Sequence, residues 1–120
     1  MGMLDNSVTG RIENYLDLLA QRQELIASNM ANVDTPNFRT RDIDFEGELH
    51  RAAAGLENTQ QPQVMEVQGL MERPDGNNVN MDREGLLLAR TQLEFRLGTT
   101  LLRHRFQNLM NVIKEGNSTP

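Results

Sequence analysis

The sequence predicts a mainly α-helical fold, in which a long helix at each end of the chain pairs with the other as an antiparallel coiled-coil-like hairpin around a small irregular or β region. Apolar residues recur at spacings of four and three near both ends, and the segment between them is polar and rich in turn-forming residues. With 120 residues, 38% hydrophobic and 4% aromatic, the chain has little material for a self-sufficient core. We therefore expect partners to cover part of its apolar surface.

The first helix is expected within residues 1–33, with its clearest pattern from about Val8 to Asn32. Charged and amide residues fill the positions between the apolar ones, as on the outer face of an amphipathic helix. The residues spaced by four and three form one line along the helix, which we call its seam. All of them except Gln23 are apolar: Ile12, Leu16, Leu19, Gln23, Ile26, Met30 and Val33.

Residues 34–80 are expected to form the linking region, as a small β element or a loop. The stretch from Asp34 to Leu49 is expected to be extended or irregular, and residues 64–67 are a strand candidate. Residues 73–76, Arg-Pro-Asp-Gly, predict a turn, because proline presets the second position and glycine suits the fourth.

The second helix is expected at residues 81–116, capped by Asn80 or Asp82 and followed by a tail at 117–120. Its sequence carries two adjoining apolar stripes, which indicate either burial against more than one neighbour or one broad face of an ordinary hairpin. The first stripe is Leu88, Gln92, Phe95, Thr99, Leu102, Phe106, Leu109 and Ile113. The second is Leu86, Ala89, Leu93, Leu97 and Leu101.

Composition argues against several function classes. The formal charge of −5 offers no basic patch to a nucleic acid, and the chain has no cysteine for disulfide or thiolate chemistry. Its two histidines, His50 and His104, are isolated and do not resemble a metal site. Neither a cleavable signal peptide nor a transmembrane span is recognisable. No small-molecule substrate or cofactor is indicated.

The best candidate for chemistry is an acidic ladder at Asp42, Asp44, Glu46 and Glu48. These carboxylates could serve acid–base catalysis or hold a cation, but the glycine-marked loop of a calcium site is missing. An exposed strand face is the simpler interpretation. With no nucleophile or phosphate-loop motif either, we expect the chain not to be an enzyme and to need no metal or cofactor.

The most specific segment is residues 27–38, ASNMANVDTPNF, where small and amide residues close the first helix before a proline. Asn29, Asn32 and Thr35 can bond nearby backbone, with Pro36 stopping the helix. This run resembles the signature of the flagellar axial proteins, which form the rod and hook. The motif positions are Ala27, Asn29, Ala31, Asn32, Thr35, Pro36 and Phe38.

Two further matches strengthen the resemblance. Residues 39–45 continue the first motif, and residues 75–84, DGNNVNMDRE, followed by Leu-Glu-Phe-Arg at 93–96, are similar to the start of the family's C-terminal helix. The resemblance covers nearly the whole chain except about residues 52–72. It implies a subunit of the proximal rod, in the basal body of the bacterial flagellum. There it would span the periplasm and help to transmit motor torque to the hook.

The resemblance also implies export by the flagellar type III apparatus without a cleavable signal. The implied partners are other proximal rod proteins, the basal-body adaptor protein, the export gate and further copies of the chain. Phe45 and Leu49 resemble a short export-gate motif, although a plain strand contact explains them equally well. Alternatives are another rod or axial subunit, or a soluble coiled-coil adaptor or secretion chaperone. The residues expected in assembly are Ile12, Leu16, Leu19, Ile26, Met30, Leu102, Phe106, Leu109 and Ile113.

Overall fold

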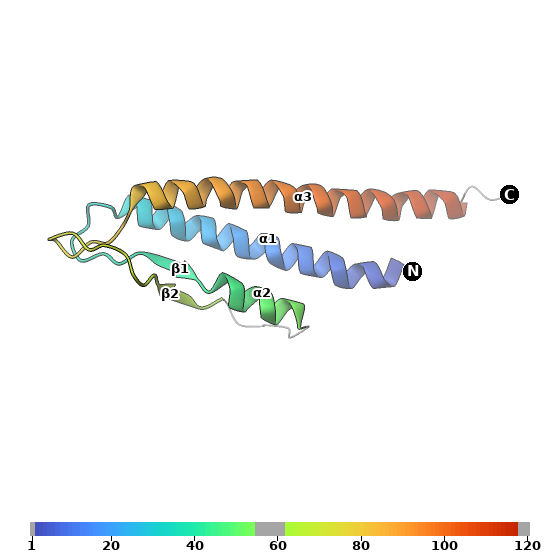
Figure 1. Cartoon of the computed structure of the whole chain (residues 1–120). Coiled ribbons are helices and arrows are strands. Elements are labelled where there is room, and N and C mark those ends of the chain that lie inside the picture. The colour runs from blue at the N-terminus through green and yellow to red at the C-terminus, as the bar shows by residue number, and fades with distance from the viewer. Residues whose placement is uncertain (1, 55–61, 118–120) are drawn as a thin grey trace.

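The computed structural model describes residues 2–54 and 62–117, and it is an elongated body of 75 × 26 × 17 Å. Helix α1 (Gly2–Ala31) and helix α3 (Met81–Asn117) lie side by side and antiparallel (Figure 1). This confirms the predicted pair of terminal helices with a small β region between them. The last part of the predicted tail, residues 118–120, lies outside the described residues.

An arm made of three short elements lies along α1, on the side away from α3 (Figure 1). Strand β1 (Arg41–Ile43) pairs antiparallel with β2 (Val64–Glu66), with Asp42 opposite Met65. Helix α2 (Phe45–Ala53) follows β1. Helix α1 is therefore covered on two sides, whereas α3 packs mainly against α1.

The middle of the chain partly departs from the prediction. The strand at 64–66 and the turn at 73–76 are confirmed, the latter by a 2.8 Å hydrogen bond from the Gly76 N–H to the Arg73 carbonyl. The prediction of extended chain up to Leu49 is wrong from Phe45 onward, because α2 begins there. Asp44 caps this helix by accepting from the Gly47 N–H at 3.3 Å.

The acidic ladder is accordingly not a strand face. Asp42 belongs to β1, Asp44 is the cap of α2, and Glu46 and Glu48 lie in the first turn of α2, where carboxylates suit the helix dipole. Capping and dipole stabilisation outweigh the period-two alternation that suggested a strand. The start of α3 follows the prediction, since Asn80 Oδ1 accepts from the Arg83 N–H at 3.1 Å.

The apolar core is small. It lies where α1 meets β1 and α3, and its buried side chains are Ile12, Leu18, Leu19, Ile26, Ile43 and Val79. The accessible surface is 8716 Å², whereas a compact monomer of this mass exposes roughly 6,600 Å². No helix in the described ranges has an apolar stretch long enough to cross a membrane.

Candidate functional site

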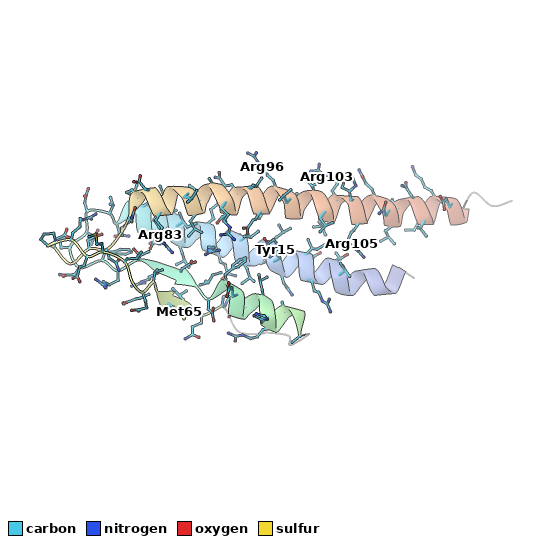
Figure 2. The ribbon with its side chains drawn as sticks, viewed as in Figure 1. Tyr15, Met65, Arg83, Arg96, Arg103 and Arg105 are labelled. Carbon is cyan, nitrogen blue, oxygen red and sulfur yellow. The ribbon has the colours of Figure 1, made fainter. Side chains whose placement is uncertain are left out.

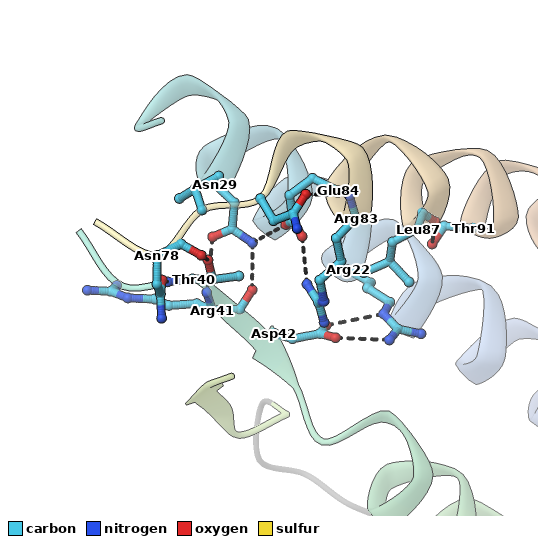
Figure 3. A network of polar contacts seen from close by, with 12 residues as sticks. Arg22, Asn29, Thr40, Arg41, Asp42, Asn78, Arg83, Glu84, Leu87 and Thr91 are labelled. Atoms are coloured by element: carbon cyan, nitrogen blue, oxygen red, sulfur yellow. Dashed lines mark hydrogen bonds and ion pairs between the residues drawn. The ribbon is translucent and has the colours of Figure 1, made fainter. Parts of the chain in front are cut away.

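The side chain of Asn29 joins the end of α1 to both β1 and α3 (Figure 3). Its amide nitrogen donates to Glu84 Oε1 at 2.5 Å and to the Arg41 carbonyl at 2.8 Å, and its oxygen accepts from the Arg41 N–H at 3.0 Å. Asn29 is 1% exposed and Glu84 is 0% exposed. Arg83 Nη1 contacts the other Glu84 oxygen at 2.6 Å. The buried carboxylate thus has the charged and amide partners that its burial requires.

Asn77 holds the chain just after α1. Its amide nitrogen donates to the carbonyls of Asn32, at 2.9 Å, and Thr35, at 2.8 Å. Its oxygen accepts from the Val79 N–H at 2.8 Å, so the side chain of Asn77 is bonded at both ends although it is 0% exposed. Two carbonyls of the turn that follows α1 thus accept hydrogen bonds from a residue more than forty positions further along the chain.

Asn78 makes an equivalent link to the segment that leads into β1 (Figure 3). Its oxygen accepts from the Thr40 N–H at 2.6 Å, its backbone carbonyl accepts from Thr40 Oγ1 at 3.3 Å, and its N–H donates to the Phe38 carbonyl at 3.3 Å. Thr40 and Asn78 are both buried. We call Asn29, Thr40, Asn77, Asn78 and Glu84 the junction cluster. It fastens α1, β1 and α3 together at one end of the molecule.

The remaining motif positions shape the helix exit or face outward. Asn32 Nδ2 donates to the Ser28 carbonyl at 2.8 Å, and Thr35 Oγ1 donates to Asn32 Oδ1 at 3.0 Å. Phe38 is half-buried, with the Arg41 guanidinium 6.0 Å from its ring centre. The exposed motif positions are Ala27, Ala31, Thr35 and Pro36.

The turn at 73–76 adds further hydrogen bonds to the segments that meet at the junction cluster. The Arg73 guanidinium donates to the carbonyls of Val33 and Val79, the latter at 3.2 Å. Asn37 and Gly76 both adopt positive φ, 64° and 85°, and Asn37 donates its N–H to the Asp75 carbonyl at 2.9 Å. A Cβ on Gly76 would lie 2.3 Å from Asn37 Oδ1, so a larger residue there would displace the Asn37 side chain in addition to straining the positive φ.

The arm is attached to α1 by aromatic and charged contacts. The rings of Tyr15 and Phe45 meet edge to face at 5.8 Å, and the Arg22 guanidinium lies 4.9 Å from the centre of the Phe45 ring. Arg22 also makes a two-point contact with the Asp42 carboxylate, at 2.9 and 3.2 Å. Leu49, the other residue of the export-like pair, is half-buried on α2.

Tyr15 also reaches the third layer, because its hydroxyl donates to Glu94 Oε2 on α3 at 2.8 Å. Burial, reinforced by this hydrogen bond and by the Glu94 charge, raises the pKa of Tyr15 to about 12. Tyr15 therefore couples the arm, α1 and α3 near the middle of the molecule (Figure 2).

The residues expected in assembly divide into three groups by their exposure. Three of them, Ile12, Leu19 and Ile26, are buried within the chain itself. At the other extreme, Phe106 is 64% exposed and Ile113 is 48% exposed. The half-buried members are Leu16, Met30, Leu102 and Leu109. Of these nine residues, only Phe106 and Ile113, both on α3, are exposed.

Sequence reasoning missed the line along which α3 meets α1. That line runs through Glu84, Thr91 and Gly98, which are buried and spaced by seven residues. A Cβ on Gly98 would lie 2.7 Å from Leu16 Cδ2, so the helices approach closely there. The line runs between the two predicted stripes. The seven-residue spacing was a usable signal, but a search for apolar periodicity passes over glutamate, threonine and glycine.

Asn77 and Asn78 were noticed only as part of a motif, and their role depends on partners about forty residues away in sequence. In the described ranges, no three metal-ligating side chains come together. Most polar groups of the junction cluster form hydrogen bonds with one another or with the backbone. This arrangement therefore stabilises the fold.

Comparison with known proteins agrees with this geometry. Residues 16–39, the second half of α1 and its exit, match the family model described as flagella basal body rod protein. The chain is 37% identical to the flagellar basal body rod protein FlgB of Salmonella typhimurium, over 88% of this chain and 91% of that protein. It is 36% identical to FlgB of Escherichia coli K12 over the same shares, and 32% identical to FlgB of Borrelia hermsii over 83% and 90%.

Proposed function

The chain belongs to the FlgB family of flagellar basal body rod proteins, and from that premise we propose that it is a structural subunit of the rod in the flagellar basal body. The observation that carries the proposal is the combination of a rigid junction with an open apolar surface. On α3, the apolar side chains of Leu86, Leu97 and Phe106 are 75%, 62% and 64% exposed, and exposed apolar surface of this kind marks an interface with another molecule.

Within the basal body, we assign the chain to the proximal part of the rod, where copies pack alongside other rod proteins and help to transmit torque from the motor to the hook. The elongated two-helix body supports this assignment, since long helices packed side by side resist bending and twisting. The proposed role is structural and not catalytic. The side chains of Asn29, Asn77 and Glu84 in the junction cluster are hydrogen-bonded within the chain, which supports a role in shape.

The test is genetic complementation in a Salmonella typhimurium strain that lacks its own FlgB. Expression of this chain is expected to restore basal bodies that contain it, and motility with them. Replacing Leu109 on α3 with Asp is expected to abolish incorporation while leaving the amount of protein in the cell unchanged. Met71→Asp is the matched control, since Met71 is 93% exposed and belongs to neither α1 nor α3. Motile cells that carry Leu109→Asp would refute the assembly role.

We further propose that the chain is exported by the flagellar type III apparatus, with Phe45 and Leu49 read by the export gate. Because Phe45 packs against Tyr15 and Arg22 in the folded chain, this recognition takes place before the arm folds onto α1. The double change Phe45→Ala and Leu49→Ala is expected to reduce secretion into the medium in a hookless strain. Val64→Ala, an exposed position on β2, is the control. Undiminished secretion of the double variant would remove Phe45 and Leu49 from this role.

The proposed partners are the basal-body adaptor protein, the export gate, other proximal rod proteins and further copies of the chain. The open faces of α3 support contact with more than one neighbour. Site-specific photo-crosslinkers at Leu93 and Phe106, both more than half exposed, are expected to capture rod or basal-body components in complemented cells. Products that contain only cytoplasmic proteins would favour an adaptor or chaperone instead.

A further inference from the structure

The small sheet has one edge that is closed and one that is open. On the outer edge of β1, the side chain of Asn29 accepts from the Arg41 N–H at 3.0 Å and donates to the Arg41 carbonyl at 2.8 Å. Strand β2 pairs with the other edge of β1 and lies farther from α1 (Figure 1). The outer edge of β2 is therefore turned away from the helix pair.

The register of the ladder shows which main-chain groups lie on this open edge. The Val67 N–H donates to the Thr40 carbonyl at 2.9 Å, so the main chain of Val67 faces β1. Because hydrogen-bonded and outward-facing residues alternate along an antiparallel pair, the N–H and carbonyl groups of Val64 and Glu66 point away from β1. Arg41, the partner of Glu66 in the register, likewise turns its main chain away from the ladder. No described residue bonds to the main chain of Val64 or Glu66.

The side chains of β2 are also accessible. Val64 is 49% exposed and Met65 is 43% exposed, and Glu66 is exposed as well. A row of unpaired N–H and carbonyl groups flanked by accessible apolar side chains is a template on which another extended segment can pair. Because β2 has only three residues, main-chain hydrogen bonds to it are few, and side chains must supply much of the affinity and the selectivity.

The charge beside the open edge is negative. An open hollow of about 400 Å³ adjoins it on one face of the sheet. The two arginines that line this hollow, Arg22 and Arg83, are each held by a carboxylate, at 2.9 and 2.6 Å. Glu46 and Glu66 form no ion pair with another described residue. The hollow is lined by residues that include Asp44, Phe45, Glu46, Met65, Glu66 and Val67.

We propose that the outer edge of β2 binds an extended, positively charged segment of another protein as a third strand of the sheet. The outward N–H and carbonyl groups of Val64 and Glu66 pair with the main chain of that segment, and Lys or Arg at its alternate positions lies beside Glu46 and Glu66. The contact goes beyond the proposed rod function, because it involves neither α3 nor a second copy of the chain.

Amide hydrogen exchange, followed residue by residue by nuclear magnetic resonance, tests the pairing directly. The probe is a peptide of about ten residues in which Lys alternates with Val, added to the full chain at a concentration where light scattering shows a monomer. Saturating peptide is expected to slow exchange of the Val64 and Glu66 amides at least tenfold. Exchange of the Val67 amide, which is already bonded to the Thr40 carbonyl, should change little.

Two control peptides separate main-chain pairing from charge. N-methylation of two adjacent central residues blocks both edges of the peptide and should abolish the protection, and replacement of every Lys by Glu should do the same. Binding of the Lys–Val peptide without protection of Val64 and Glu66, or equal binding of the Glu peptide, would overturn the proposal. Absence of binding at millimolar peptide would do so too. Protection that appears in the concentrated chain without peptide would show that a second copy occupies the edge instead.

Changes in the chain itself give a second measurement. Val64→Pro removes an outward N–H and no ladder hydrogen bond, so it is expected to weaken binding of the Lys–Val peptide at least fivefold, whereas Val64→Ala, which keeps the N–H, stays within twofold. Slow exchange of the Val67 amide in both variants checks that the sheet is intact. Glu66→Gln is expected to weaken binding about threefold, and Asp34→Asn, at an exposed position outside the arm, should leave it unchanged.

The outcome that contradicts the edge contact is equal peptide affinity for Val64→Pro and Val64→Ala with the sheet intact. Equal effects of Glu66→Gln and Asp34→Asn would contradict the role of local charge. Neither result bears on the rod assignment, which genetic complementation tests separately. If complementation fails while the peptide protects Val64 and Glu66, the edge contact stands and the rod assignment fails.

Discussion

The two ends of the helix pair are built in opposite ways. At the junction end, several of the most deeply buried side chains are polar: Asn29, Asn77 and Glu84 are at most 1% exposed, and each is bonded within the chain. At the open end of α3, apolar side chains such as Phe106 and Ile113 are about half exposed or more. Polar groups fix the shape because hydrogen bonds are directional, while apolar surface is left for association.

This contrast gives a physical meaning to the axial-protein motif. Its amide residues end α1 and fasten it to β1 and to the segment before α3. The motif thus determines the angle at which the chain leaves the helix, and the helix faces determine what the subunit touches. Substitutions at the two ends should therefore separate folding from assembly.

The largest effect on stability is expected from Asn29→Ala. This change removes three hydrogen bonds and leaves the buried Glu84 carboxylate with Arg83 as its remaining charged contact at the junction. The loss in free energy of unfolding should be about 3 kcal/mol, measured by urea denaturation. Asn14→Ala, at an exposed position on α1, is the control. An unchanged urea midpoint for Asn29→Ala would show that the junction is not the rigid end.

Gly76→Ala is expected to have the next largest effect, about 2 kcal/mol, because it combines backbone strain at positive φ with a collision between Cβ and Asn37 Oδ1. Gly69→Ala separates the two causes. Gly69 has a similar φ of 82°, but a Cβ there meets nothing within 4 Å. That variant should lose only about 1 kcal/mol. Equal losses in urea denaturation would mean that the contact with Asn37 contributes nothing.

The sequence was informative about regular elements and less so about what joins them. The terminal helices follow from apolar spacing, and the turn at 73–76 from its Pro and Gly. The start of α2 was missed, although Asp44 followed by Glu46 and Glu48 is a helix-start signal, because the alternation of Ile43 and Phe45 also fits a strand. Local pattern alone does not resolve this conflict, and contacts of Phe45 with Tyr15 and Arg22 favour the helix.

For the candidate site, the sequence predicted the motif residues at the end of α1 but not the residues that they contact. The motif placed Asn29 and Asn32 at the end of α1, but their partners Glu84 and Asn77 come from 55 and 45 residues further along. The buried line through Glu84, Thr91 and Gly98 carries no apolar side chain at all. Rules that place apolar residues inside fail there, because hydrogen bonding and close helix approach make polar and small residues the buried ones.

A smaller loss in the free energy of unfolding is expected from a change at Tyr15, near the middle of the molecule. Tyr15→Phe removes the hydroxyl that donates to Glu94 but keeps the ring against Phe45. The loss should be about 1 kcal/mol, measured by urea denaturation near neutral pH. Glu94→Gln is a useful companion, because an uncharged acceptor still receives the hydrogen bond and should lose less. A larger loss for Glu94→Gln than for Tyr15→Phe would contradict the assignment.

The same tyrosine predicts a dependence on pH. Its pKa is 10.0 in the unfolded chain and about 12 in the folded chain, so the folded state retains the proton more strongly. This contribution to stability is complete below pH 10 and is lost as the pH rises toward 12. Tyr15 is the only tyrosine, so its ionisation can be followed alone by ultraviolet absorbance. A folded-state midpoint near 10 would contradict the coupling to Glu94.

The smallest effect on the free energy of unfolding is expected at the open end of α3. Ile113 is 48% exposed, so Ile113→Ser removes little buried area and should change the free energy of unfolding by less than about 0.5 kcal/mol. If this end of α3 serves association, the same change should lower incorporation into basal bodies in complemented cells. Asn29→Ala should instead lower stability first and incorporation only in consequence. A loss of stability at Ile113 as large as that at Asn29 would mean that both ends are part of one cooperative fold, and the division between shape and association would not hold.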